Sequence, residues 1–272
     1  MNQQPIALIT GASAGIGAEF ARQLAAAGHH IALTARRRER LDELAATLTK
    51  DHGVECLVIP ADLADPKAPE MIVETIKEAG FRVEVLINNA GFAVGGFYTA
   101  ASWADQARFM QVMVTAVAEL THRVLPGMLE ANQGQIVNVA SVAGIVAGSS
   151  GHTLYAASKA FLIKFSESLA MENHHTGVTV QALCPGFTLS EFHDVIGNRH
   201  LVSQMPAYMW MRADEVVTIS LAALKNPKAP VMLVPGWVNR FLAFLSRKLP
   251  YRWAYALVRK RSGDFRLQEP AA

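Results

Sequence analysis

The chain has 272 residues, of which 51% are hydrophobic and 18% are charged, and its formal net charge is +2. This composition is typical of a globular protein and excludes the fibrous and the extensively disordered classes. The charge lies too close to neutral to indicate a protein that binds nucleic acid.

Targeting and metal-binding signals are absent from the sequence. The amino-terminal stretch lacks the basic start and long apolar core of a signal peptide. No uninterrupted apolar run approaches the roughly 20 residues of a transmembrane helix. Cys56 and Cys184 lie in separate apolar, strand-like runs, and neither has a second cysteine nearby. We therefore expect a cytoplasmic protein with core cysteines and no metal site.

Short apolar runs alternate with stretches of helical periodicity, such as 18–27 and 38–50. Nearly continuous apolar strands are typical of a parallel sheet that is covered on both faces. The pattern predicts an α/β fold with one doubly wound, Rossmann-like parallel sheet of about seven strands. The expected strands are 6–10, 31–35, 56–61, 83–88, 135–140, 178–184 and 231–234.

The alternation loosens after about residue 187. We expect residues 1–272 to form a single domain, in which the later segments are additions rather than a second domain. Residues 187–212 are expected to cover the substrate, and residues 236–265 to form a helical carboxyl-terminal extension.

The first expected strand leads into the sequence TGASAGIG, residues 10–17, which opens a helix. Gly11, Gly15 and Gly17 allow the backbone to turn tightly and to approach a pyrophosphate, whose charge the helix amino terminus stabilises. The position of this turn after the first strand of a βαβ unit indicates a nucleotide site. The alternative is a glycine turn that serves only helix packing.

The second expected strand ends at Ala35, where sites for an unphosphorylated cofactor usually have an acidic residue. Arg36 follows, and its guanidinium can pair with a 2′-phosphate that a carboxylate would repel. The pattern therefore favours NADP(H) over NAD(H). For Arg37, Arg38 and Arg40 the preferred interpretation is the solvated start of a helix, which stays an alternative for Arg36.

The stretch TLYAASKAF, residues 153–161, places one tyrosine and one lysine four positions apart in an Ala-rich run without Pro or Gly. If the run is helical, Tyr155 and Lys159 project from the same face about one turn apart. A phenol and an ammonium in this arrangement can contact the same bound molecule.

Several motifs in a fixed order resemble those of the short-chain dehydrogenase/reductase family, in particular its NADP-preferring bacterial members. The resemblance spans residues 10 to about 190 and implies an NADP(H)-dependent oxidoreductase that interconverts a ketone or aldehyde and an alcohol. It also implies a homodimer or homotetramer acting on a small molecule. The matching pieces are Thr10-Gly11-x3-Gly15-x-Gly17, Asp62-Leu63, NNAG at 88–91, Ser141, Tyr155-x3-Lys159 and Pro185-Gly186.

The resemblance implies three catalytic residues. Tyr155 would protonate a carbonyl oxygen, or act as the base in the reverse direction, and Lys159 would lower the tyrosine pKa from its usual value of about 10 and bind the nicotinamide ribose. Ser141 would orient the carbonyl. Ser141 precedes Tyr155 by one position more than is usual, which we expect the intervening loop to absorb. The alternative role for Ser141 is to satisfy backbone groups at a strand end.

The resemblance also implies a cofactor trough along the strand ends. Asp62 would accept from the adenine amino group, and Thr188 would meet the carboxamide or diphosphate, with Ser190 sharing that role. The implied cofactor-binding residues are Gly11, Ser13, Ala14, Gly15, Ile16, Gly17, Arg36, Asp62, Leu63, Asn88, Asn89, Ala90, Gly91, Tyr155, Lys159, Pro185, Gly186 and Thr188.

One position departs from the family pattern. The family usually places an asparagine of its proton relay on the helix before the fifth strand, where this chain has Met113. A thioether cannot hold an ordered water as an amide does. Either the backbone carbonyl of Met113 suffices for the relay, or the chain binds cofactor but turns over poorly; we expect a working enzyme.

Two later segments carry many apolar side chains. The substrate-covering segment favours a hydrophobic or aryl substrate, although its residues could equally be core. The tail 236–261 combines aromatic residues with seven basic and no acidic ones. Packing or a subunit contact is its expected role, with contact to an anionic membrane as the alternative. The candidates in the substrate-covering segment are Phe187, Phe192, Met205, Tyr208, Met209, Trp210 and Met211. In the loop between Ser141 and Tyr155, Ser149, Ser150 and His152 are further candidates for substrate contact, and solvent exposure is the preferred interpretation for each.

Overall fold

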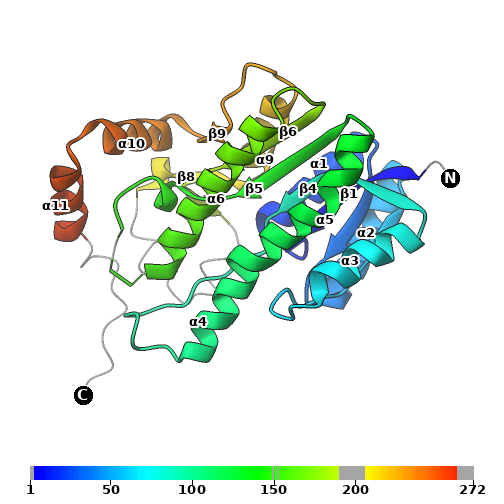
Figure 1. Cartoon of the computed structure of the whole chain (residues 1–272), viewed down its shortest axis with the longest axis horizontal. Helices are drawn as coiled ribbons and strands as arrows, with labels where there is room; N and C mark the ends of the chain where they lie inside the picture. The colour runs from blue at the N-terminus through cyan, green and yellow to red at the C-terminus, as the bar shows by residue number, and fades with distance from the viewer. Residues whose placement is uncertain (1–2, 149, 152, 190–205, 262–272) are drawn as a thin grey trace.

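The computed structural model describes residues 3–148, 150–151, 153–189 and 206–261 (Figure 1). Seven parallel strands form one sheet in the order β3-β2-β1-β4-β5-β6-β9. The prediction of a doubly wound, Rossmann-like parallel sheet is confirmed. The strands are β1(Gln4–Thr10), β2(His30–Thr34), β3(Cys56–Val58), β4(Phe81–Asn88), β5(Gly134–Val139), β6(Val178–Leu183) and β9(Met232–Leu233).

Helices cover both faces of this sheet (Figure 1). One face packs against α1, α2 and α9, and the other against α3, α5 and α6. The strands are therefore apolar on both faces, which explains why their sequences read as continuous apolar runs rather than as alternating ones. The helices are α1(Gly15–Ala26), α2(Arg38–His52), α3(Ala68–Glu78), α5(Ala116–Glu130), α6(Thr153–Glu172) and α9(Ala213–Leu224).

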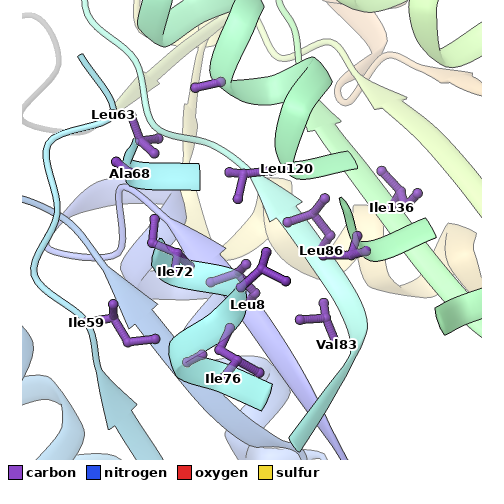
Figure 2. Packing of buried hydrophobic residues seen from close by; sticks show 14 of the residues in the cluster. Leu8, Ile59, Leu63, Ala68, Ile72, Ile76, Val83, Leu86, Leu120 and Ile136 are labelled. Atoms are coloured by element: carbon purple, nitrogen blue, oxygen red, sulfur yellow. The ribbon is translucent and has the colours of Figure 1, made fainter. Parts of the chain in front are cut away.

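The core between α3 and the sheet shows how the sequence pattern becomes packing (Figure 2). Ile72 and Ile76 lie one turn apart on α3, are fully buried, and pack with Leu8 of β1 and Leu86 of β4. Burying a side chain of this size contributes roughly 1.5 to 3 kcal/mol. The spacing of four along the helix thus fixes α3 on this face of the sheet.

Two strands are shorter than their sequences predict. The third strand was expected over 56–61 and ends at Val58, while the seventh was expected over 231–234 and has only two residues. Both lie at the edges of the sheet, where a strand has a hydrogen-bonding partner on one side only. The apolar character of the run continues past the point where ladder hydrogen bonds end.

A π turn interrupts the long helical run before β5. Helix α4(Trp103–Met110) continues through the π turn η1(Gln111–Thr115) into α5. The periodicity of the sequence does not reveal this turn. π turns frequently occur at functional sites, and this one contains Met113.

The last part of the chain adds a small sheet and two helices. Strands β7(Phe187–Leu189) and β8(Trp210–Arg212) pair in parallel, and the 3-10 turn η3(Ala207–Met209) precedes β8. The expected extension contains α10(Trp237–Lys248) and α11(Tyr251–Arg261), which lie at the opposite end of the molecule from α2 and α3 (Figure 1). Within the described part of the chain, no helix is long and apolar enough to cross a membrane.

Some expected features fall outside the described residues. These are Ser149, His152, Ser190, Phe192, Met205 and the end of the extension at 262–265.

Candidate active site

The glycine-rich turn lies between the end of β1 and the start of α1. Gly11 has a φ of +66°, and a Cβ atom placed on Gly17 would overlap the Gly11 carbonyl and the Asn89 side chain. No side chain caps the amino terminus of α1, and its first turn contains no acidic residue. Backbone N–H groups and the helix dipole are therefore available for a pyrophosphate, so the residues present fit a dinucleotide cofactor.

Thr10 and Asn89 hold this turn against the end of β4. The Thr10 hydroxyl donates to the carbonyl of Ile87 (3.1 Å) and accepts from the backbone N–H groups of Asn89 (2.9 Å) and Ala90 (3.0 Å). The Asn89 amide donates to the carbonyl oxygens of Thr10 (2.9 Å) and Gly11 (3.2 Å). Asn89 thus fixes the cofactor turn from behind.

Asn88 lies differently from its neighbour. Its side chain is buried and donates to Asn138 Oδ1 (2.8 Å) and to Thr121 Oγ1 (3.2 Å), while the Asn138 amide donates to Ser166 Oγ (2.9 Å). The sequence predicts that Asn88 lines the cofactor trough. In the structure its side chain belongs to a buried hydrogen-bond network that joins β4, β5, α5 and α6. The reason is that Asn88 is the last residue of β4 and points into the packed interior.

Two arginines follow the end of β2, and one of them contacts the glycine-rich turn. Arg36 is exposed, and Arg37 donates from Nη2 to Ser13 Oγ (3.0 Å). From the sequence, Arg37 was interpreted only as the solvated start of a helix. In the structure its guanidinium also contacts Ser13 of the glycine-rich turn. The sequence does not show which of several consecutive arginine side chains points towards the glycine-rich turn. Only the structure shows that Arg37 does so.

Asp62 also has a partner that the sequence did not reveal. Its Oδ1 accepts from the Ala64 N–H (3.0 Å), and its Oδ2 accepts from Arg108 Nη2 (2.7 Å). Arg108 belongs to α4, and both side chains are partly exposed. The neighbouring Leu63 is buried in the core next to α3, so its side chain contributes to packing.

Ser141, Tyr155 and Lys159 come together at the carboxyl end of β5. Ser141 begins the 3-10 turn η2(Val142–Gly144), accepts from the Ala143 N–H (3.1 Å), and forms a hydrogen bond with the Tyr155 side chain. Lys159 lies one turn further along α6, with Nζ 5.6 Å from the centroid of the Tyr155 ring. The loop therefore absorbs the additional residue between Ser141 and Tyr155.

Lys159 is 6% exposed, although lysine is almost never buried without a partner. Its Nζ donates to the Val139 carbonyl oxygen (2.7 Å). Burial lowers the pKa of Lys159 to about 8, because the charged form loses its hydration. Such a strongly perturbed group beside a tyrosine and a serine marks a candidate catalytic site.

The pKa of Tyr155 changes in the direction opposite to the prediction from sequence. Tyr155 is partly exposed as a residue, but desolvation of its hydroxyl raises the pKa to about 12, while the hydrogen bond from Ser141 acts to lower it. The sequence predicts that Lys159 lowers this pKa. In the chain itself the desolvation effect is larger, so the phenol is fully protonated at neutral pH.

The Pro185-Gly186 turn completes the edge of the site. The Pro185 carbonyl accepts from the Val142 N–H (3.0 Å), and the buried Thr188 hydroxyl donates to the Gly186 carbonyl (3.2 Å). A Cβ atom on Gly186 would overlap the side chain of Asn239 from α10. Asn239 is 5% exposed and donates to the Pro235 carbonyl (3.0 Å), so the extension is anchored at this turn.

Met113 occupies its predicted place near the site, within the π turn. Its side chain is 1% exposed, and its sulfur would lie 3.0 Å from a Cβ atom on Gly91. The thioether is therefore packed against the NNAG segment and supplies no polar group.

The described part of the substrate-covering segment is aromatic. The rings of Phe187 and Trp210 lie 5.4 Å apart across the β7–β8 pair, and Met211 packs with the core on the α9 side. Tyr208 is exposed. The described residues contain no group of three His, Cys, Asp or Glu side chains that could hold a metal ion.

Residues 5–200 match the family model for short chain dehydrogenases. The chain belongs to the short-chain dehydrogenase/reductase family. It is 34% identical over 242 residues to the very-long-chain 3-oxoacyl-CoA reductase of Anas platyrhynchos, a match that covers 87% of this chain and 75% of the relative. This relative is an oxidoreductase.

Two solved structures resemble the chain over nearly its full length. A short-chain dehydrogenase from Sphingobium yanoikuyae, in complex with NADPH, is 32% identical with a TM-score of 0.78, and the match covers 98% of each chain. The bulky-bulky ketone specific alcohol dehydrogenase from Comamonas testosteroni is 28% identical with a TM-score of 0.73, and the match covers 100% of this chain and 98% of that one.

Proposed function

We propose that this short-chain dehydrogenase/reductase is an NADP(H)-dependent oxidoreductase that interconverts a hydrophobic or aryl ketone or aldehyde and the corresponding alcohol. The observation that carries the proposal is the convergence of Ser141, Tyr155 and Lys159 at the carboxyl end of β5. We further propose that residues 1–272 form one domain and that the protein assembles as a homodimer or homotetramer.

The proposed roles follow from the protonation states. Tyr155 acts as the general acid in reduction, because its phenol is protonated at neutral pH and can donate to the carbonyl oxygen. Ser141 hydrogen-bonds the carbonyl oxygen and holds it against the phenol. Lys159 supplies positive charge behind Tyr155, which stabilises the phenolate that remains after proton transfer.

The cofactor would be held along the strand ends and would supply the hydride. Gly11, Gly17 and the amino terminus of α1 would bind the pyrophosphate. Arg36, Arg37 and Ser13 would bind the 2′-phosphate, since two guanidinium groups lie at the end of β2 where an acid would be needed for NAD(H). The NADPH bound in the Sphingobium relative supports this choice.

The substrate class rests on the aromatic lining and on the relatives. Phe187, which follows the Pro185-Gly186 turn, and Trp210, whose ring lies 5.4 Å from that of Phe187, offer apolar surface for a substrate. The ketone that names the Comamonas relative and the acyl chain that names the reductase of Anas platyrhynchos are both bulky or apolar. We infer that the pocket accepts a carbonyl compound with a large hydrophobic substituent.

The test is the oxidation of NADPH by the purified protein across a panel of aryl, aliphatic and β-keto carbonyl compounds. Replacing Tyr155→Phe should lower turnover by about 10²- to 10⁴-fold, because it removes the acid and leaves the ring in place. Tyr251→Phe is the matched control, since the same hydroxyl is removed from an exposed residue of α11. Equal turnover in the Tyr155 variant and the parent protein would refute the catalytic role.

The same assay tests the cofactor. With NADH in place of NADPH, kcat/KM should fall, and Arg36→Ala should lower kcat/KM for NADPH by about 10- to 100-fold, as expected for one charge-assisted hydrogen-bonded pair. Arg40→Ala, in the first turn of α2, should leave this kcat/KM unchanged. A preference for NADH in the parent protein would contradict the proposed 2′-phosphate site.

Met113 favours a second candidate function. Its packed thioether occupies the position where the family pattern described above usually has an asparagine, which suits a protein that binds NADP(H) without efficient turnover. This candidate predicts tight NADPH binding and no turnover across the entire panel. Measurable turnover that depends on Tyr155 would exclude it.

A further inference from the structure

Helix α10 presents its aromatic side chains to solvent. Trp237, Phe241 and Phe244 follow a helical spacing of four and three, and their exposed fractions are 71%, 59% and 58%. The opposite side of the helix is buried through Ala243 and Asn239. A surface helix normally turns its apolar stripe towards the core, so this outward stripe indicates a surface that something else covers.

Helix α11, which follows α10 directly in the chain, also exposes aromatic side chains. Its exposed side chains include Tyr251, Trp253, Tyr255 and Leu257, whereas Ala254 is 6% exposed. Large exposed apolar side chains that gather in one part of a protein often mark an interaction site. Tryptophan and tyrosine in particular suit a boundary that is apolar on one side and hydrated on the other.

The surface is also strongly basic. The chain has 25 Lys and Arg and 23 Asp and Glu residues, and the tail 236–261 contains seven of the former and none of the latter. The rest of the chain therefore has 18 basic and 23 acidic residues. The exposed residues that we call the aromatic–basic face are Trp237, Arg240, Phe241, Phe244, Arg247, Lys248, Tyr251, Arg252, Trp253, Tyr255, Leu257, Arg259 and Lys260.

On α10 the basic residues lie beside the aromatic ones on the exposed side of the helix. On α10, Lys248 Nζ lies 6.0 Å from the centroid of the Phe244 ring. A helix that inserts aromatic side chains into a lipid interface while its basic residues meet anionic headgroups has this composition.

A second copy of the chain fits this face less well. In a two-fold symmetric dimer the same patch meets itself, which would bring two sets of basic residues together without an acid between them. Like charges that meet across an interface oppose association. An anionic surface of continuous negative charge has no such difficulty.

We propose that the aromatic–basic face docks on the surface of an anionic lipid bilayer, with α10 and α11 lying in the headgroup region. The inner side of α10 contacts Gly186 through Asn239. An α-helix with its side chains is about 10 to 12 Å wide, so a docked α10 holds the strand-end site about one helix diameter from the lipid.

The experiment is sedimentation of the full-length protein with vesicles of phosphatidylcholine alone or mixed with phosphatidylglycerol. We expect at least about tenfold more binding to the mixed vesicles, and a loss of binding as salt rises. Emission from Trp237 and Trp253 should shift to shorter wavelength on binding, because both indoles leave water.

Two paired variants separate the contributions. Phe241→Gln combined with Phe244→Gln, and Arg247→Gln combined with Lys248→Gln, should each lower binding to mixed vesicles by about tenfold or more. Trp103→Gln is the matched control, because Trp103 of α4 is 71% exposed but lies outside the face. Unchanged binding in both paired variants would overturn the proposal.

The subunit alternative is tested with the same proteins. Sedimentation equilibrium without vesicles should give the same oligomeric state for the parent protein and for the Phe241 and Phe244 variant. If the parent protein does not bind mixed vesicles, and the paired phenylalanine variant dissociates its oligomer, the face is a subunit contact and membrane docking is refuted.

Discussion

Helices α6 and α10 depart from the usual relation between polarity and burial in opposite ways. Helix α6 buries Lys159 and Ser166, whereas α10 exposes Phe241 and Phe244. Burying a charged group costs free energy, and proteins accept this cost mainly where the group has a function in the interior. Apolar rings are exposed where their partner lies outside the chain. The comparison supports our two proposals, that α6 carries catalytic residues and that α10 forms a docking surface.

The largest effect is expected when the buried charge of α6 is replaced by an apolar side chain. Lys159→Met should lower turnover by about 10²- to 10⁴-fold, because the positive charge behind Tyr155 is lost. At pH 7 the variant should also be more stable, by about 1 to 2 kcal/mol, since the folded protein no longer buries an ammonium whose pKa is lowered to about 8.

The pH dependence of this stability difference has a definite sign. Below about pH 8 the lysine is protonated in both the folded and the unfolded parent protein, so the full cost of burial is present. Between about 8 and the unfolded value of 10.5, the unfolded chain binds more protons than the folded one, and the parent protein gains stability as pH rises. The variant's advantage should therefore shrink across this window.

Urea unfolding at neutral and at alkaline pH measures the effect. Lys164→Met on the same helix is the control, because Lys164 is exposed and paired with Glu167, and its stability should change by less than about 0.5 kcal/mol. A Lys159 variant that is less stable at pH 7 would contradict the assignment of a burial cost.

An intermediate effect is expected at the buried polar residue of α10. Asn239→Ala should lower stability by about 1 to 3 kcal/mol, because the Pro235 carbonyl loses its donor and a gap forms beside Gly186. KM for NADPH should rise as the Gly186 turn loses its support, with less change in kcat. Thermal unfolding and steady-state kinetics measure the two effects, and an unchanged KM would show that Asn239 serves packing alone.

The smallest effect is expected when the exposed aromatic side chains of α10 are replaced by polar ones. Phe241→Gln combined with Phe244→Gln should change stability by less than about 0.5 kcal/mol, because both rings are already in solvent. Phe109→Ala, which empties a fully buried site in α4, should by comparison cost about 3 to 5 kcal/mol. A large loss of stability in the paired variant would show that the rings of α10 are packed in solution.

The sheet could be predicted from the sequence because its determinants are local. A strand such as β1 reads as an apolar run, and the turn from Gly11 to Gly17 follows it directly. Tyr155 and Lys159 are likewise set on one face by their spacing within α6. Local spacing was sufficient wherever one element carries the whole feature.

Contacts between distant elements could not be predicted in this way. Arg37 and Ser13 are 24 positions apart, and Arg108 and Asp62 are 46 apart, so no periodicity links them. The pKa of Tyr155 was missed for the same reason, since desolvation depends on everything that packs around the hydroxyl. The neighbouring lysine was visible in the sequence, whereas the surrounding protein was not.

The π turn η1 gives the helical run from α4 to α5 an unusual tolerance to a change in length. A π turn holds more residues than the α-helical turn it replaces. Loss of one residue within 111–115 can be absorbed if this turn relaxes to a regular one, with Phe109 and Leu120 still facing the sheet. The same deletion within α5 would rotate every later residue by about 100°. The turn is therefore the point in this helix where related sequences can differ by one residue without losing register.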